Sequence, residues 1–172
     1  MEYSMWYVIQ VRTGTEESIR IQCEKKIPKS VMERCFIPYY EEKRKIRGSW
    51  TTIQKVLFPG YVFIVSQKIE DLYVHLKHIM GFTKLIGSGN EIVPLTQKEK
   101  KFLLSLGGEE QVVTMSEGII EGKQVKVLEG PLAGREGMIR RIDRHKRKAW
   151  MEVDMFGRKQ LVQVGLEIVG KI

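Results

Sequence analysis

Residues 58–65 read Phe58-Pro59-Gly60-Tyr61-Val62-Phe63-Ile64-Val65, and the first part of the chain is organised around them. From Gly60 onward the segment is almost entirely apolar, which is typical of a central strand buried on both faces. The Pro-Gly pair places a bend directly before that strand, and a glycine there allows a partner backbone to approach closely. Aromatic residues at such a bend are favoured as binding anchors, although large aromatics more often fill a core, as we expect for Tyr7 and Phe63.

The flanking segments predict helices and strands packed around this strand. We expect strands over residues 6–11, 36–40, 60–65 and 82–86, and helices over residues 15–27, 69–79 and from 96 onward. Thr15 has the hydroxyl of a helix N-cap, and Pro28 ends that helix. Thr96 with Glu99 three residues later forms a capping box. The polar residues 41–52 predict a solvated hairpin or loop.

A different pattern begins after Gly107-Gly108-Glu109-Glu110. Residues 107–118 predict a linker between a first domain, residues 1–106, and a second domain, residues 119–172. The second domain contains short predicted strands over residues 124–128, 137–142, 149–153, 160–164 and 166–169. Strands this short and numerous can close into a small barrel, which removes exposed sheet edges.

The charge of the chain favours a polyanionic partner. The formal net charge is +8, and residues 118–172 hold 12 Lys+Arg against 7 Asp+Glu. Such a chain is attracted to nucleic acid or to an anionic membrane. No long apolar run and no signal-peptide pattern is present at the N-terminus, so we expect a cytoplasmic protein that binds no membrane. Cys23 and Cys35 lack metal-finger spacing and predict two buried thiols.

Two clusters of basic residues are the candidate contacts to nucleic acid. Residues 140–148 contain six Lys or Arg and one acid between two predicted strands, so their turn can contact several phosphates at once. Trp150 follows and could stack a base, with a buried tryptophan as the alternative. Residues 43–47 could follow upstream DNA or RNA, or form a plain solvated hairpin. The candidate RNA-binding residues are Arg140, Arg141, Arg144, His145, Lys146, Arg147, Lys148, Lys43, Arg44, Lys45 and Arg47.

The order of these motifs resembles the NusG family of transcription factors. The N-terminal motifs are Trp6-Tyr7-Val8, Phe36-Ile37-Pro38, Phe58 to Phe63, Met80-Gly81-Phe82 and Pro94-Leu95, and the C-terminal ones are Glu129-Gly130-Pro131-Leu132-Ala133-Gly134 and Phe156-Gly157-Arg158. The resemblance implies an α+β N-terminal domain, with an antiparallel-rich sheet flanked by helices, and an all-β, SH3-like KOW barrel. It implies that the first domain binds the clamp region of RNA polymerase, through Tyr7, Phe58, Pro59, Gly60, Tyr61 and Phe82. On this basis we expect Phe58 and Tyr61 to be exposed.

Departures from the family pattern indicate a specialised paralogue. Leu132 and Arg135 stand where family members usually have aromatics in the first barrel loop, whereas Phe156 is retained. The candidate partner-binding residues of the barrel are Leu132, Arg135, Met155 and Phe156. His78-Ile79 replaces an Asn-Thr pair that contacts non-template DNA in some general factors. The chain is therefore similar to the LoaP-like branch of antiterminating NusG paralogues.

Three functions follow from the sequence. The first is a processive antitermination factor that binds RNA polymerase and an RNA hairpin in a leader transcript, with possible contacts to non-template or upstream DNA. The second is a general elongation factor acting through the termination factor Rho or a ribosomal protein, and the third is a ribosome-associated KOW protein. No nucleophile–base pair, Walker loop or metal-ligand set is present in the sequence, so we expect no enzymatic activity, cofactor or metal. We also expect a monomer.

Overall fold

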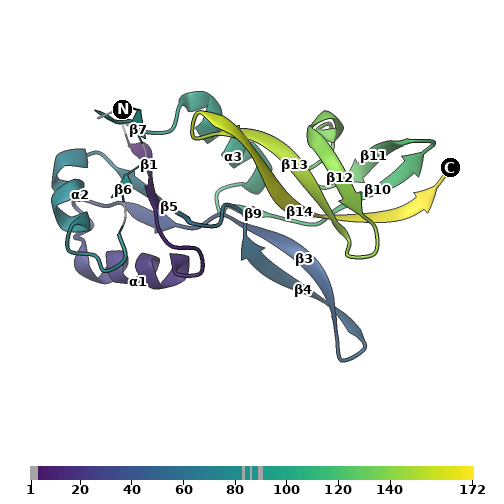
Figure 1. The fold of residues 1–172 in the computed structure, drawn as a ribbon, viewed down its shortest axis with the longest axis horizontal. Helices are drawn as coiled ribbons and strands as arrows, with labels where there is room; N and C mark the ends of the chain where they lie inside the picture. The colour runs from purple at the N-terminus through teal and green to yellow at the C-terminus, as the bar shows by residue number, and fades with distance from the viewer. Residues whose placement is uncertain (1–3, 83, 86, 89–90) are drawn as a thin grey trace. The chain divides into compact units, whose positions relative to one another are not determined.

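The computed structural model describes residues 4–82, 84–85, 87–88 and 91–172 (Figure 1). The chain forms two compact units. Unit 1 combines the residues up to 37 with residues 58–100, and unit 2 combines residues 38–57 with residues 101–172. Residues 38–57, which the sequence places in the first domain, therefore pack with the C-terminal part of the chain.

Unit 1 is built on a four-stranded antiparallel sheet in the order β2-β5-β1-β6. Its strands are β1 (Met5–Gln10), β2 (Arg34–Phe36), β5 (Tyr61–Ser66) and β6 (Lys84–Leu85). The prediction that residues 60–65 form a central buried strand is confirmed, because β5 lies between β1 and β2 and most of its residues are buried. The predicted strand 82–86 falls partly on residues 83 and 86, which lie outside the described residues.

A single strand over residues 36–40 was predicted, and the structure divides this region at Pro38. β2 ends at Phe36, and β3 (Tyr39–Ile46) begins after the proline and belongs to unit 2. Proline cannot donate a ladder hydrogen bond, so it separates the two strands. A further pair of short strands, β7 (Gly87–Ser88) and β8 (Glu91–Ile92), follows β6.

The chain contains helices α1 (Glu16–Lys26), α2 (Ile69–Leu76) and α3 (Gln97–Gly107). The capping box of α3 is confirmed: the Thr96 N–H donates to Glu99 Oε1 at 2.8 Å, and the Glu99 N–H donates to Thr96 Oγ1 at 3.1 Å. The prediction that Thr15 caps α1 is wrong, because its hydroxyl donates to the Arg12 carbonyl instead. Helix α2 ends three residues before the predicted end at Ile79.

Aromatic side chains form much of the core of unit 1. The rings of Trp6 and Phe36 lie 4.9 Å apart, those of Phe36 and Phe63 lie 5.4 Å apart, and those of Phe58 and Phe63 lie 5.9 Å apart. Helix α1 packs Ile19 and Cys23 inward. Cys23 and Cys35 are both buried free thiols, as predicted.

Unit 2 contains two sheets. The smaller has the order β4-β3-β9, with β4 (Ser49–Val56) antiparallel and β9 (Val112–Val113) parallel to β3. The larger has the order β11-β10-β14-β13-β12, with β10 (Ser116–Glu121), β11 (Gln124–Glu129), β12 (Ile139–Asp143), β13 (Lys148–Met155) and β14 (Arg158–Lys171). A 3₁₀ turn over Glu136–Met138 precedes β12. The all-β character of the C-terminal region is confirmed.

Strand β14 joins the two halves of the larger sheet. Residues 158–165 pair antiparallel with β13, and residues 166–171 pair parallel with β10. The two short strands predicted over 160–164 and 166–169 are thus one continuous strand. The predicted linker, residues 107–118, contains β9 and the start of β10.

The β3–β4 hairpin packs directly against β14 within unit 2 (Figure 1). Gly165 marks the closest approach, since a Cβ at this position would clash with the carbonyl oxygen of Glu41 and the sulfur of Met115. The Met115 N–H also donates to Glu41 Oε1 at 3.0 Å. A glycine in β14 therefore allows the hairpin backbone to lie against the barrel strand.

Candidate nucleic-acid interface

The aromatic residues proposed to bind RNA polymerase are mostly buried in unit 1. Tyr7, Phe58 and Tyr61 are all buried, so the expectation that Phe58 and Tyr61 are exposed is wrong. The physical reason is that Phe58 packs on Phe63 in the aromatic core. Burial also raises the pKa of the Tyr7 hydroxyl.

Gly60 and Pro59 shape the turn before β5. Gly60 has a φ of 91°, in the left-handed region that favours glycine, and a Cβ there would lie 3.4 Å from both Thr13 Oγ1 and the Val11 carbonyl. Within the chain, this glycine allows Val11 and Thr13 to lie close to its backbone, and the expected close approach of a partner stays a prediction. Pro59 is exposed, and Phe82 is half-buried with its ring 6.5 Å from that of Tyr73.

Glu16 fixes this turn, and the sequence indicated it only as a first-turn acid. Its side chain is buried, and its two carboxylate oxygens accept hydrogen bonds from the Gly14 N–H at 2.8 Å and the Gly60 N–H at 2.7 Å. The start of α1 is thereby connected to the residues that open β5. A carboxylate bound by two backbone donors is a strong, charge-assisted arrangement.

The larger basic cluster lies on the β12–β13 turn, as predicted. Asp143 Oδ1 accepts a hydrogen bond from the Lys146 N–H at 2.9 Å and closes the turn. This backbone bond and nearby cations lower the pKa of the Asp143 carboxyl. Arg144, His145 and Lys146 are exposed at the tip. The turn therefore presents its central cations to solvent.

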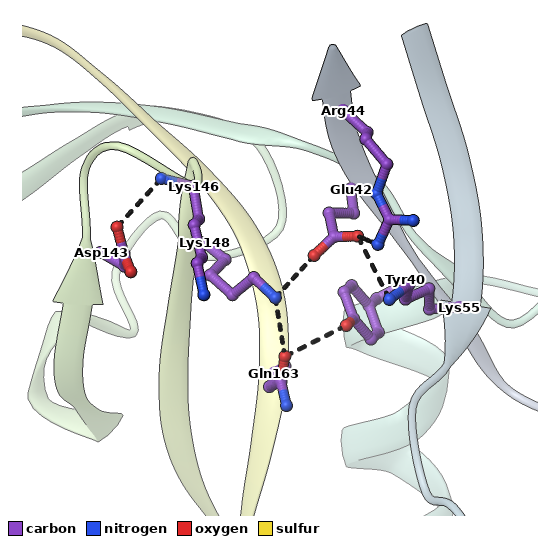
Figure 2. Close-up of polar contacts among 8 residues, drawn as sticks. All are labelled: Tyr40, Glu42, Arg44, Lys55, Asp143, Lys146, Lys148 and Gln163. Carbon is purple, nitrogen blue, oxygen red and sulfur yellow. Dashed lines mark hydrogen bonds and ion pairs between the residues drawn. The ribbon is translucent and has the colours of Figure 1, made fainter. Parts of the chain in front are cut away.

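The two basic clusters, separate in the sequence, meet in unit 2. Glu42 on β3 is buried, and its Oε1 lies 2.7 Å from Lys148 Nζ on β13 (Figure 2). Glu167 on β14 binds both clusters, with Lys43 Nζ at 2.6 Å and Arg147 Nε at 3.3 Å. The β3–β4 hairpin and the β12–β13 turn thus form one surface, which we call the joint basic surface: residues 43–50 and 144–148.

Glu42 is the centre of this junction. Besides Lys148 it contacts Arg44 Nη2 at 3.3 Å and Lys55 Nζ at 3.6 Å. Lys148 Nζ also donates to Gln163 Oε1 at 3.0 Å, and Gln163 Oε1 accepts from the Tyr40 hydroxyl at 3.4 Å (Figure 2). Every polar side chain of the junction has a hydrogen-bond or ion-pair partner. These interactions offset the free-energy cost of burying the polar groups.

The carboxyl groups of the junction are ionised at neutral pH. Burial raises the pKa of Glu42, but the hydrogen bond from Lys148 and the surrounding cations lower it more, so its pKa lies below the ordinary value. The hydrogen bond from Lys43, together with the charges of Lys43 and Arg147, outweighs burial and lowers the pKa of Glu167. Burial and the charge of Glu42 raise the pKa of Tyr40 to about 12, so this hydroxyl stays protonated as a donor.

Ion pairing divides the predicted RNA-binding residues other than Arg141 and His145 into two groups. Among the described residues, no ion pair or hydrogen bond involves the side chains of Lys45, Arg47 and Arg144, and Lys146 has no ion pair within 4.0 Å. The paired group consists of Lys43, Arg44, Arg147, Lys148 and Arg140, whose Nη2 lies 3.0 Å from Glu152 Oε2. The first group can bind phosphates without breaking an existing ion pair.

Two tryptophans accompany these cations. Trp150 is half-buried, with the Arg141 guanidinium 4.6 Å and Lys148 Nζ 5.8 Å from its ring centroid. Trp50, on β4 beside the hairpin turn, is 48% exposed and carries the Arg147 guanidinium 3.5 Å from its ring centroid. Sequence reasoning missed Trp50, although its position within three residues of Arg47 was a usable signal.

Comparison with known proteins shows to which family the chain belongs. The family model described as "Transcription termination factor nusG" matches residues 4–104, more than half of the chain. The chain belongs to the NusG family. A second family model, "KOW motif", matches residues 121–154.

Relatives agree with this assignment along nearly the whole chain. The "Transcription termination/antitermination protein NusG" of Staphylococcus aureus strains Mu50 and N315 is 29% identical over 97% of this chain and 95% of the relative. A solved structure titled "Domain interaction in Thermotoga maritima NusG" has a TM-score of 0.61 at 24% identity, and covers 96% of this chain and 94% of that one. The protein is therefore a NusG-family transcription elongation and termination factor.

The KOW residues predicted to bind partners differ in accessibility. Leu132 and Met155 are fully buried, so they fill the core of this NusG-family unit and are not available for contact. Arg135 is half-buried and donates to the Pro131 carbonyl at 2.8 Å and to Ser105 Oγ at 2.6 Å. Phe156 is half-buried at a φ of 59°.

Other predicted features of this NusG-family chain concern membranes and metals. No helix among the described residues combines the length and apolarity needed to cross a bilayer. Within that part of the chain, no group of three ligating side chains is placed to hold a metal ion.

Proposed function

We propose that this NusG-family protein is a processive antitermination factor of the specialised, LoaP-like kind. Its N-terminal domain binds RNA polymerase, and its joint basic surface binds an RNA hairpin in a leader transcript. Binding of both suppresses pausing and termination at the operons whose leaders carry that hairpin. The observation that carries the proposal is the meeting of two basic segments, about a hundred residues apart, on one surface whose outer cations are unpaired.

The charge of this surface favours a structured RNA. Arg144 and Lys146 lie on the β12–β13 turn, and Lys45 and Arg47 lie on the β3–β4 hairpin, two different segments of the joint basic surface. Cations on two segments can contact phosphates on two strands, as a folded RNA provides. Arginine forks can in addition pair with guanine edges in a loop or bulge. Non-template or upstream DNA is an additional ligand for the same cations.

The test uses the full chain and a fluorescein-labelled leader RNA stem-loop. We expect Arg144→Glu with Lys146→Glu to weaken binding by at least about tenfold and to make the affinity less dependent on salt, since each lost phosphate contact lowers the salt slope by about 1. The matched control is Lys123→Glu with Lys171→Glu, which changes the charge equally at exposed positions of β14 and the β10–β11 turn. Equal losses in both variants, or none in the first, would refute the RNA site.

The proposed polymerase contact needs revision within unit 1. Pro59 and the half-buried Phe82 are the accessible members of the predicted set. Tyr73, whose ring contacts Phe82, is 38% exposed and extends that apolar surface along α2. We propose that Pro59, Phe82 and Tyr73 contact the polymerase, while Tyr7, Phe58, Gly60 and Tyr61 support them from the core. Co-purification with RNA polymerase should be lost in Phe82→Ala with Tyr73→Ala and retained in Ile21→Ala, at an exposed position of α1.

A general elongation factor acting through proteins is the second candidate. The match to termination/antitermination proteins over nearly the whole chain favours it. It predicts that the C-terminal KOW domain binds Rho or a ribosomal protein through Arg135 and Phe156. Pull-down of either protein, with no leader specificity in a transcription assay, would support this candidate over the first. A ribosome-associated KOW protein is less favoured because the nusG model covers residues 4–104.

A further inference from the structure

Trp50 occupies an unusual place for a large aromatic side chain. It is the second residue of β4, pairs across the hairpin with Lys45, and keeps 48% of its surface exposed. Burial of an indole is strongly favoured, yet Trp50 is the most exposed aromatic side chain among the described residues, ahead of Tyr73 at 38%. The exposed part of the ring is therefore available to a ligand.

We propose that Trp50 is a stacking platform for an unpaired base in the loop of the bound RNA. This inference rests on the proposed function and adds a base contact to a surface that otherwise recognises phosphates. An indole has a flat π-face that stacks on any base, and base–aromatic stacking is the usual way in which proteins hold unpaired nucleotides.

Arg147 holds the platform in place. Its guanidinium carbon lies 3.5 Å from the centroid of the Trp50 ring, which is direct cation–π stacking. Its Nε lies 3.3 Å from Glu167 Oε1, and Glu167 is in turn held by Lys43 at 2.6 Å. The indole is thus backed by a guanidinium that two further residues keep in orientation, so less rotational freedom is lost when a base stacks on it.

Exposed cations lie beside Trp50 on the same hairpin and can bind the phosphates of a nucleotide stacked on its ring. Lys45 is the cross-strand neighbour of Trp50, and Arg47 forms the hairpin turn at a φ of 50°. Both are exposed. An aromatic face flanked by unpaired cations is the combination that single-stranded nucleic acid requires, because the bases stack while the backbone phosphates bind the cations.

An unpaired base is favoured over a duplex for a steric reason. Bases within a helix are stacked on their neighbours and present only their edges in the grooves, so an indole face cannot reach them. Trp150, the other candidate for stacking, is less suitable because it is half-buried, whereas Trp50 is 48% exposed. Trp50 is therefore the tryptophan of unit 2 that we assign to the RNA loop.

The test compares two RNA probes on the full chain. One is a fluorescein-labelled stem-loop with 2-aminopurine in the loop, and the other is a blunt duplex with the same stem. We expect Trp50→Ala to weaken binding of the stem-loop by about 5- to 150-fold and to leave the duplex affinity unchanged. Trp50→Phe should restore most of the affinity, and the change in 2-aminopurine fluorescence on binding should disappear only in Trp50→Ala. Leu161→Ala, which removes another exposed apolar side chain of unit 2, is the matched control.

The possible results separate this inference from the proposed function. The stacking platform is refuted, and the RNA surface stands, if two results are obtained together. Trp50→Ala binds the stem-loop with the same affinity as the unchanged protein, and Arg144→Glu with Lys146→Glu does not bind it. Equal loss for stem-loop and duplex also refutes the platform. If the unchanged protein binds neither probe, the proposed RNA function itself is wrong. Equal affinity for a stem-loop made of DNA would overturn the assignment to RNA.

Discussion

The ion pair between Glu42 and Lys148 should contribute strongly to the docking of the hairpin on the barrel, and a double-mutant cycle can measure it. The cycle combines Glu42→Gln, which keeps the shape of the side chain, with Lys148→Met. The two side chains are 4% and 13% exposed, and their charged atoms lie 2.7 Å apart. The joint basic surface depends on this junction, because Glu42 lies on the hairpin and Lys148 begins β13.

The magnitude follows from the burial of the pair. Exposed ion pairs couple by about 0.2–1 kcal/mol, whereas breaking a buried pair costs about 3–5 kcal/mol. Lys148 keeps some access to water and retains its bond to Gln163 when Glu42 is changed. We therefore expect a coupling energy of about 2 kcal/mol, between these limits. Because the pair is shielded, most of this energy should persist at 1 M salt, where the Debye length is about 3 Å.

The assay is urea unfolding of the full chain, followed by the fluorescence of Trp50 and Trp150 with all variants carrying Trp6→Phe. Since every chain in the cycle shares that change, its effect cancels. The control cycle uses Arg140→Met and Glu152→Gln, a pair with 48% and 31% exposed side chains, which should couple by less than about 1 kcal/mol. A Glu42–Lys148 coupling below about 0.5 kcal/mol would show that this pair does not hold the hairpin.

Three further predictions concern stability. Glu16→Ala should lower the free energy of unfolding of unit 1 by about 2 kcal/mol, because the N–H of buried Gly60 loses its acceptor; an unchanged urea midpoint for the Trp6 signal would contradict this. Leu132→Ala should cost about 2–5 kcal/mol in a urea titration, whereas Leu161→Ala, at a 60% exposed position, should change the free energy by less than about 0.5 kcal/mol. The Glu42 carboxyl has a lower pKa in the folded than in the unfolded chain, so its stabilisation is complete above the unfolded pKa of about 4.3 and is lost as pH falls through the folded value. Stability measured by urea titration should therefore fall more steeply below about pH 4.5 in the unchanged protein than in Glu42→Gln, and parallel curves would exclude this role.

The sequence by itself determined the elements whose signals are local. The apolar run in β5, the capping box of Thr96 and Glu99, and the β-rich C-terminal region are set by periodicity and by neighbours a few residues away. The basic turn at 144–148 was likewise predictable, since consecutive charges between two strands must lie at the surface.

Only the tertiary structure decided which side chains are accessible and which segments meet. Phe58 and Tyr61 resemble binding anchors in the sequence, but packing against the sheet buries them. The two basic segments meet for two reasons. Gly165 has no side chain, so the hairpin backbone can lie against β14, and Glu42 and Glu167 form ion pairs with cations of the hairpin and of the β12–β13 turn. Burial and ion pairing depend on residues far apart in the chain, and no local pattern specifies those contacts. The sequence therefore determined that the chain is basic, and the fold determined that Lys45, Arg47, Arg144 and Trp50 form one surface.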